Sequence, residues 1–234
     1  MLERMTPAGE HTPAIAFFDV DNTIVDGSTM FQLARTAWSE GFIGVVDVAR
    51  FAWHQLTFRT VGETGAQMRT ARGRGLKLIE GKPSEAIRQI AKDAYRLHIS
   101  RNLIGPSVDR ARRHLAHGDS VWLVTASPQY LGHIIATDLG LTGALGTLVE
   151  EHDGVATGRL LGEPLHGPLK VDAIRRVARE HGVELADCWA YSDSINDVPM
   201  LTAVGHPVAV NPDAALRAYA RLHGWEILGK RKKR

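Results

Sequence analysis

The sequence predicts an α/β protein with a doubly wound parallel sheet and an inserted α-helical cap domain, and three observations support this. Short apolar runs that do not alternate with polar residues recur along the chain, and each ends abruptly in polar residues. Segments with helical spacing separate the later runs, and a long helical stretch follows the first run. Such runs are typical of strands buried on both faces of a parallel sheet, and strand–helix alternation gives a doubly wound sheet.

Four short apolar runs are predicted to form strands of this sheet. A run of this length is also compatible with a buried helix segment, so the flanking residues decide between the two. Glycine and proline residues around the runs favour strands that alternate with helices and connect through right-handed crossovers. The runs are residues 14–18 (AIAFF), 121–124 (VWLV), 188–191 (CWAY) and 208–210 (VAV).

Helices are expected between these runs because apolar residues recur there at helical spacing. Serine and proline favour the start of a helix, and glycine favours its end. The boundary residues are Ser127 with Pro128 and Gly140 for the helix after the second run, Pro168 and Gly182 for the helix before the third, and Gly118 for the helix before the second; a last helix is expected over residues 213–222.

Residues 28–104 interrupt the alternation with helical spacing and no convincing strand. We interpret them as a helical cap inserted between the first strand and the rest of the sheet. Aromatic residues at roughly helical spacing are interpreted as the core of this cap, with a substrate-binding surface as the alternative: Trp38, Phe42, Phe51, Trp53 and Phe58. The predicted division is an α/β core over 1–27 and 105–228, the cap over 28–104, and a basic tail over 229–234.

The chain ends in five basic residues, 230–234, and without them the net charge of +2 becomes −3. Such a run is typical of a solvated end, with peripheral contact to an anionic membrane as the alternative; no nucleic-acid partner is expected. The single cysteine, Cys188, excludes an intramolecular disulfide. With no secretory leader or run long enough to span a membrane, we expect a cytoplasmic protein.

Polar residues follow three of the predicted strands. The carboxyl ends of parallel strands share one edge of a sheet, and ligands bind there where the strand order reverses. Three carboxylates at that point repel one another unless a cation lies among them, and oxygen ligands suit Mg²⁺. The residues are Asp19 and Asp21 after the first strand, Thr125 after the second, and Asp193, Asn196 and Asp197 after the third.

Lys170 lies in the first turn of its predicted helix, where the helix dipole disfavours a cation. This placement suggests that an anion is held nearby. The helix start at Ser127 offers free backbone N–H groups, which bind phosphate well. With a cation and the Thr125 hydroxyl, these groups describe a phosphate site. One aspartate beside it can act as a nucleophile and form an acyl-phosphate, and a second can act as general acid and base.

Four segments, DVDNT, LVTAS, PLK and YSDSIND, occur in this order and resemble the four motifs of the haloacid dehalogenase-like superfamily. The helical insertion after the first motif, and the hairpin signalled by Asp153 and Gly154 before the lysine, resemble its phosphoserine-phosphatase-like subgroup. The resemblance covers about residues 14–228. It implies a Rossmann-like core with a helical cap. It also implies an Mg²⁺-dependent phosphatase that acts on a small phosphorylated metabolite through an aspartyl-phosphate.

The resemblance also implies roles for individual residues. Asp19 would be the nucleophile and a metal ligand, and Asp21 would be the general acid and base and lend its carbonyl to Mg²⁺. Asp193 would be the acidic metal ligand. The phosphate- and substrate-binding residues would be Thr125, Ser127, Lys170 and Asn196, with Asp197 supporting Lys170.

Some positions differ from the pattern of phosphoserine phosphatases. Ser28 stands where those enzymes place a glutamate that grips the substrate ammonium, and Ser192 and Ser194 stand where glycines are usual. Phosphoserine phosphatase activity proper is therefore one alternative, and phosphoryl transfer to an acceptor alcohol is another. The candidates for pairing with a substrate carboxylate are Arg69, Arg72 and Arg74.

Overall fold

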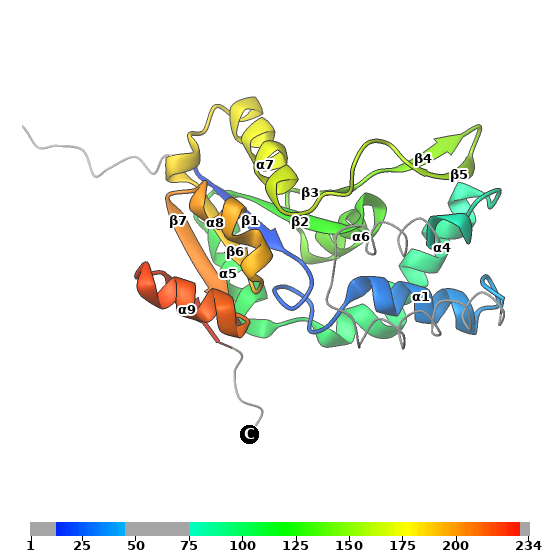
Figure 1. Cartoon of the computed structure of the whole chain (residues 1–234), viewed down its shortest axis with the longest axis horizontal. Helices are drawn as coiled ribbons and strands as arrows, with labels where there is room; N and C mark the ends of the chain where they lie inside the picture. The colour runs from blue at the N-terminus through cyan, green and yellow to red at the C-terminus, as the bar shows by residue number, and fades with distance from the viewer. Residues whose placement is uncertain (1–12, 45–74, 230–234) are drawn as a thin grey trace, which may run out of the picture.

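The computed structural model of the protein describes residues 13–44 and 75–229. A six-stranded sheet with the order β3-β2-β1-β6-β7-β8 forms its centre (Figure 1). Every neighbouring pair in this sheet is parallel, which confirms the predicted fold class. The strands are β1 (Ile15–Asp19), β2 (Ser120–Pro128), β3 (Gly143–Thr147), β6 (Trp189–Ser192), β7 (His206–Val210) and β8 (Glu226–Leu228).

The strand order reverses between β1 and β6. The chain builds outward from β1 through β2 to β3, then returns to the other side of β1 and continues through β6, β7 and β8. Register pairs Asp19 of β1 with Val124 of β2, and Phe18 of β1 with Tyr191 of β6. The residues that follow these pairs therefore come together at the reversal point, where open α/β sheets bind their ligands.

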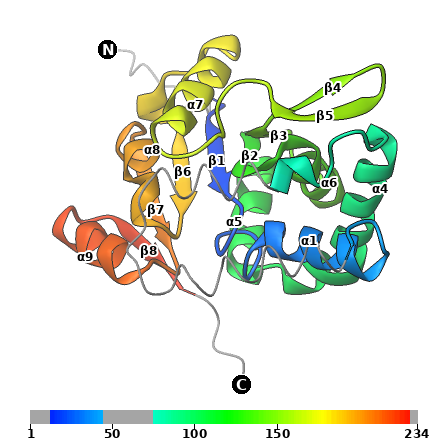
Figure 2. The ribbon, with the colours of Figure 1, turned by 45° about the vertical axis from the view of Figure 1, so that its right-hand side comes forward.

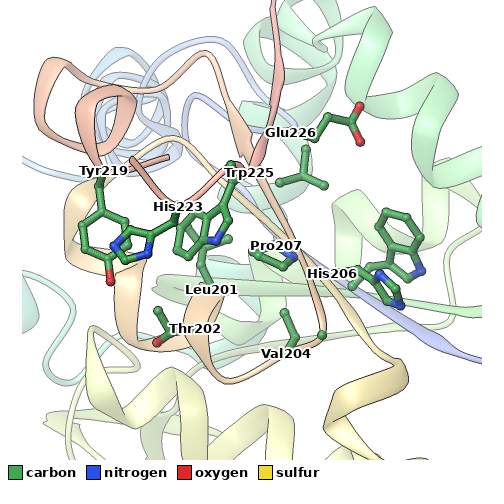
Figure 3. Close-up of a pocket in the computed structure, with 13 residues that line it drawn as sticks. Leu201, Thr202, Val204, His206, Pro207, Tyr219, His223, Trp225 and Glu226 are labelled. Carbon is green, nitrogen blue, oxygen red and sulfur yellow. The ribbon is translucent and has the colours of Figure 1, made fainter. Parts of the chain in front are cut away.

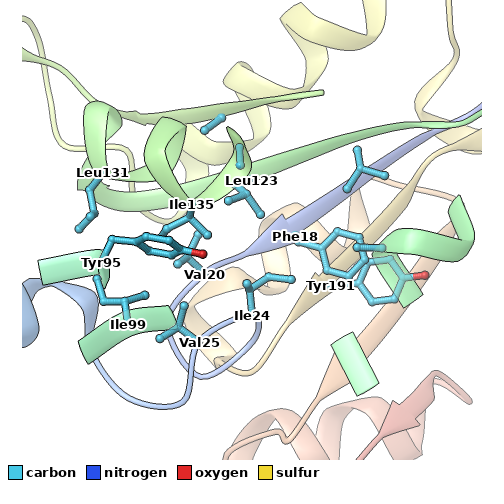
Figure 4. Close-up of a cluster of buried hydrophobic side chains, with 14 of the residues drawn as sticks. Phe18, Val20, Ile24, Val25, Tyr95, Ile99, Leu123, Leu131, Ile135 and Tyr191 are labelled. Carbon is cyan, nitrogen blue, oxygen red and sulfur yellow. The ribbon is translucent and has the colours of Figure 1, made fainter. Parts of the chain in front are cut away.

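Both faces of the sheet are buried, which explains why the strand sequences do not alternate. In β1, Ala16 and Phe18 belong to one buried cluster, drawn in Figure 4, whereas Ile15 and Phe17 belong to a second. The first cluster receives side chains from α5 (Gly105–Ala116) and α6 (Gln129–Leu139), and the second from α7 (Pro168–Glu180), α8 (Val198–Thr202) and α9 (Ala214–Leu222).

Most predicted helix boundaries are confirmed. Pro168 is the first residue of α7, and Gly140 follows α6 with a left-handed φ of 67°. Asp213 caps α9 because its side chain accepts a hydrogen bond from the backbone N–H of Leu216. The prediction that Ser127 caps α6 is wrong. β2 continues to Pro128, the helix begins at Gln129 without a side-chain cap, and the Ser127 hydroxyl contacts Thr29 instead.

Two edge strands of the sheet were not predicted. β3 (GALGT) is built from small residues that carry little strand signal. β8 (EIL) is too short to show a period. The predicted hairpin is confirmed: β4 (Val149–His152) and β5 (Val155–Leu160) pair antiparallel across a turn in which Asp153 and Gly154 have positive φ.

The described part of residues 28–104 carries α1 (Thr29–Ser39), α4 (Ser84–Ala94), a π-helical segment (Tyr95–Ile99) and a 3₁₀ turn (Ser100–Asn102). Both ribbon views place α1 and α4 on the side toward which the carboxyl end of β1 points (Figures 1 and 2). The hairpin reaches the start of α4, where the Ser84 N–H donates to the Gly154 carbonyl at 2.8 Å. The cap boundaries themselves stay a prediction.

Several expectations lie outside the described residues. They concern the basic tail at 230–234 and the residues Phe51, Trp53, Phe58, Arg69, Arg72 and Arg74. Among the described aromatic residues of the predicted cap core, Trp38 is 50% exposed, so the interpretation as core is wrong for this residue. It lies in the last turn of α1, beyond the helix's buried residues Thr29, Thr36 and Ala37. In the part of the chain that the structure describes, no helix has the length and apolar character needed to cross a membrane.

Candidate active site

Lys170 joins two carboxylates at the carboxyl edge of the sheet. Its Nζ lies 2.6 Å from Asp19 Oδ1 and 2.7 Å from Asp197 Oδ2. Asp19 ends β1, Lys170 comes from the first turn of α7, and Asp197 ends a short 3₁₀ helix after β6. All three are buried, and the Ser192 hydroxyl donates to Asp197 Oδ2 at 2.7 Å. Three segments far apart in sequence therefore meet at this edge: the end of β1, the loop after β6 and the start of α7.

The charges of this cluster are not balanced among themselves. Burial raises the pKa of Asp19 to about 7 against the opposing attraction of Lys170, and the charge of Asp197 raises it further. Burial alone would lower the pKa of Lys170, but Asp19 and Asp197 outweigh burial and hold the pKa above its usual range. Lys170 is therefore protonated, and its one positive charge is shared by two carboxyl groups.

Asp193 follows β6 directly and is partly buried beside the turn that follows β1. Burial raises the pKa of Asp193 to about 6, opposed by a hydrogen bond from the Asn22 side chain. Asn22 has a φ of 56°, a left-handed conformation that asparagine tolerates better than most residues. Asn22 was not predicted from the sequence. The available signal was an asparagine directly after the second aspartate of DVDN.

Asp21 is held by the start of α1. Its Oδ1 accepts a hydrogen bond from the Thr29 backbone N–H at 3.0 Å and another from the Thr29 hydroxyl at 2.6 Å. The Thr29 hydroxyl also lies 2.8 Å from Ser127 Oγ, and the Ser127 N–H donates to Thr125 Oγ1 at 3.0 Å. These bonds connect the ends of β1 and β2. Thr29 was not predicted from the sequence, because its contact with Asp21 depends on how α1 meets the sheet.

The predicted binding residues differ in burial. Thr125, Ser127 and Lys170 are buried at the strand ends, whereas Asn196 is exposed. Asp197, its neighbour in the chain, is the residue that contacts Lys170. Asp213 holds the loop that follows β6, because its N–H donates to the Asp193 carbonyl and its Oδ2 accepts from the Ile195 N–H.

The donor atoms at this edge suit Mg²⁺. Within residues 13–44 and 75–229, no three side chains of His, Cys, Asp or Glu are grouped so that they could hold a metal ion by themselves. The set that the family resemblance implies, two carboxylates from Asp19 and Asp193 with the Asp21 main-chain carbonyl, would not need a third side chain. It offers only oxygen donors and leaves positions for water and phosphate, as Mg²⁺ prefers. The residues present therefore fit this ion.

A pocket of about 630 Å³ lies elsewhere, at the amino ends of β6, β7 and β8 (Figure 3). Its lining includes Trp189 and His206, which stack with ring centroids 4.5 Å apart, and Trp225. None of the residues described above at the carboxyl edge lines it. The candidate site at the Lys170 cluster is therefore separate from this pocket.

The parallel sheet, with polar residues at the strand ends beside its reversal point, defines an α/β protein that binds its ligand at this edge. The model of the haloacid dehalogenase-like hydrolase family matches residues 16–202. The chain belongs to this family, as its four motifs indicated.

Known relatives agree with this assignment. The chain is 44% identical over 215 residues to phosphoserine phosphatase SerB1 of Mycobacterium tuberculosis (strain H37Rv), covering 92% of this chain and 70% of that protein. A crystal structure of a protein of unknown function from Bordetella pertussis Tohama I superposes with a TM-score of 0.81 at 31% identity, covering 93% of this chain and 99% of that one. A substrate-bound phosphoserine phosphatase shares the fold, with a TM-score of 0.64 at 21% identity and 94% of each chain covered.

Proposed function

We propose that the protein hydrolyses a small phosphorylated metabolite, with Mg²⁺ as cofactor and an aspartyl-phosphate on Asp19 as intermediate. The observation that carries this proposal is the buried Lys170 bridge between Asp19 and Asp197 at the reversal point of the sheet. A structural ion pair does not need to lie at a ligand-binding edge. A nucleophile that must approach an anionic phosphoryl group does need a fixed positive charge beside it.

In the proposed reaction, a carboxylate oxygen of Asp19 attacks phosphorus while the bond to the leaving oxygen breaks. Asp21 gives its proton to that oxygen, which departs as an alcohol. Asp21 then takes a proton from water, whose oxygen attacks phosphorus and releases phosphate from Asp19. Lys170 and the Thr125 hydroxyl orient the phosphoryl oxygens throughout. Mg²⁺, held by Asp19, Asp193 and the Asp21 carbonyl, would neutralise phosphoryl charge when bound.

Phosphoserine is the substrate named for the SerB1 relative, and it is the first specific candidate here. Ser28 is relevant to the choice of phosphoserine as substrate, because it stands where phosphoserine phosphatases have the glutamate that binds the substrate ammonium. In the structure Ser28 is the N-cap of α1, and its hydroxyl accepts from the Phe31 N–H at 3.4 Å. A neutral capping serine offers no ion pair to an ammonium group. We therefore propose a small phosphate ester without a strict requirement for that group.

A substrate panel with and without Mg²⁺ tests this function. Phosphoserine and 3-phosphoglycerate form a matched pair, because they differ by an ammonium against a hydroxyl group. We expect phosphate release that requires Mg²⁺ and is abolished by EDTA, with kcat/KM for the pair within about tenfold, a difference of about 1.4 kcal/mol. Measured kcat/KM values decide this point. A preference for phosphoserine above about a hundredfold would contradict the inference from Ser28.

The panel also separates the proposed reaction from its alternative. Phosphate should appear in equal amount to the dephosphorylated alcohol in water alone. Transfer to an added alcohol at the expense of free phosphate would identify a phosphotransferase. Absence of both products across the whole panel would overturn the assignment of function.

Mg²⁺ binding is expected to depend on Asp193. At pH 8, Mg²⁺ at a hundredfold excess over its Kd should stabilise the wild-type protein by about 2.7 kcal/mol. In Asp193→Asn this stabilisation should largely disappear. Differential scanning calorimetry with and without Mg²⁺ measures it, and Asp187→Asn, an exposed aspartate at the opposite edge of the sheet, is the matched control.

The metal-free Asp193→Asn protein should lose part of its pH dependence. Burial raises the pKa of Asp193 to about 6, so the folded state binds more protons than the unfolded state between about pH 4 and pH 6. This group's contribution to stability therefore falls as pH rises through that range. The asparagine variant lacks the decline and should match or exceed wild-type Tm at pH 8. If Mg²⁺ stabilised Asp193→Asn as much as it stabilises the wild-type protein, Asp193 would not be a metal ligand.

A further inference from the structure

The two oxygens of the Asp21 carboxyl group are not equivalent. Oδ1 accepts two hydrogen bonds, from the backbone N–H and the hydroxyl of Thr29. The backbone N–H belongs to the first turn of α1, one of the groups that a helix leaves without an internal acceptor. The positive end of the helix dipole lies at the same place. Oδ1 is therefore held as an acceptor by the start of α1.

The direction of the next hydrogen bond follows from counting protons. A hydroxyl carries one hydrogen, and that of Thr29 is directed to Asp21 Oδ1. In the 2.8 Å contact between the two hydroxyls, Ser127 must therefore be the donor and Thr29 the acceptor. This uses the only hydroxyl hydrogen of Ser127. The chain of donors runs from Ser127 through Thr29 and ends on Asp21.

Both hydroxyl residues of this chain of donors are buried, so water competes little for their hydrogen bonds. Thr29 is fully buried, and Ser127 is 4% exposed. The Thr125 hydroxyl differs, because its Oγ1 accepts a hydrogen bond from the Ser127 N–H and its own hydrogen is not used in that bond. Thr125 can therefore donate to a phosphoryl oxygen while Ser127 cannot do so without breaking its bond to Thr29. This differs from the phosphate-binding role that the sequence suggested for Ser127.

We propose that Thr29 and Ser127 are positioning residues for proton transfer in the phosphatase reaction. They keep Oδ1 of Asp21 free of a proton, so that Oδ2 is the oxygen that gives its proton to the leaving group and later takes one from water. A proton on Oδ1 would point at Thr29 and not at the substrate. This inference rests on the proposed function, because it needs Asp21 to act as general acid and base.

The proposal makes a prediction about leaving groups. An alkyl phosphate releases an alkoxide oxygen, which must be protonated as its bond to phosphorus breaks. 4-Nitrophenyl phosphate releases a phenolate that is stable without a proton. Loss of the positioning chain should therefore reduce kcat/KM for alkyl phosphates selectively, since kcat/KM reports the step in which the leaving group departs.

Thr29→Val removes the hydroxyl and retains the branched shape and the backbone N–H. We expect its kcat/KM to fall about a hundredfold or more for phosphoserine or glycerol phosphate, within the range that general acid catalysis supplies, and less than about tenfold for 4-nitrophenyl phosphate. Ser127→Ala should show the same selectivity with a smaller loss. Thr29→Ser, which restores a hydroxyl, should recover most of the activity.

Thr36→Val is the matched control. Thr36 is equally buried in α1, and its hydroxyl donates to the Gln32 carbonyl within the same helix. Its substitution should leave the ratio of alkyl to aryl kcat/KM unchanged. Thermal unfolding shows whether each variant is folded. If Thr29→Val does not fold, Ser127→Ala and Thr29→Ser still test the proposal.

The outcomes separate the inference from the function on which it rests. Equal losses for both classes of substrate, or no loss for either, would overturn the positioning role while leaving the phosphatase assignment in place. A wild-type protein that hydrolyses no phosphate ester would overturn the function and the inference together.

Discussion

Asp19→Asn is expected to lower kcat by about 10⁴- to 10⁶-fold for every substrate, the range observed when a member of a catalytic constellation that contains the nucleophile is removed. An amide nitrogen or oxygen cannot form the aspartyl-phosphate, and no neighbouring carboxylate can take its place without moving the phosphoryl group. Steady-state phosphate release measures the loss. Acid-quenched wild-type protein should also gain the mass of one phosphoryl group during turnover, and the variant should not.

The same variant should remain folded. Its amide oxygen can still accept from Lys170, which retains its contact with Asp197. Burial raises the pKa of Asp19 to about 7, so above that pH the wild-type protein holds a buried charge that the amide avoids. Tm of the metal-free variant at pH 8 should equal or exceed that of the wild type. Asp187→Asn serves again as the control, and near-normal turnover by Asp19→Asn would exclude Asp19 as the nucleophile.

The sequence predicted the strand ends at the carboxyl edge of the sheet better than the outer strands. Asp19, Thr125 and Asp193 each follow an apolar run, and parallel pairing brings such ends together regardless of the residues between them. The end of α6 at Gly140 and the hairpin turn at Asp153 were also predicted from the sequence, because each depends on a local backbone requirement. β3 and β8 were not predicted, since edge strands that are short or built mainly from small residues show little hydrophobic pattern.

The contact between Thr29 and Asp21 could not be read from the sequence for a different reason. It depends on the direction in which α1 leaves the sheet, which is set by packing among residues far apart in the chain. Ser127 illustrates the same limit. A serine before a proline favours a helix cap, but its hydroxyl lies beside Thr29 once α1 and β2 are in place, and tertiary structure outweighs the local preference.

Lys170→Met should destabilise the protein as well as inactivate it. Methionine fills a similar volume without the charge, so Asp19 and Asp197 would lose the cation that lies between them. Removing one partner from a buried ion pair costs about 3–5 kcal/mol, because the remaining charge is left without compensation. Urea unfolding at pH 8 measures the loss. Lys92→Met is the control, because Lys92 is half-exposed and its contact with Glu85 lies at the surface.

The destabilisation by Lys170→Met should depend on pH in a defined direction. Burial raises the pKa of Asp19 to about 7 even with Lys170 present, and Lys170 holds it down, so the pKa in the variant should be higher still. At pH 5 Asp19 binds a proton in the folded state and needs no partner. The variant's stability should therefore fall as pH rises from about 5 to 8, and its deficit relative to wild type should be smallest at pH 5.

A second substitution identifies the origin of the deficit. Lys170→Met combined with Asp197→Asn removes the other buried carboxylate, and it should recover part of the lost stability at pH 8 without recovering activity. Such separation is expected because stability requires only that buried charge be balanced, whereas turnover requires a positive charge beside the attacking oxygen. An equal deficit at pH 5 and pH 8, with no recovery in the double variant, would mean that Lys170 stabilises the fold through packing and not through its charge.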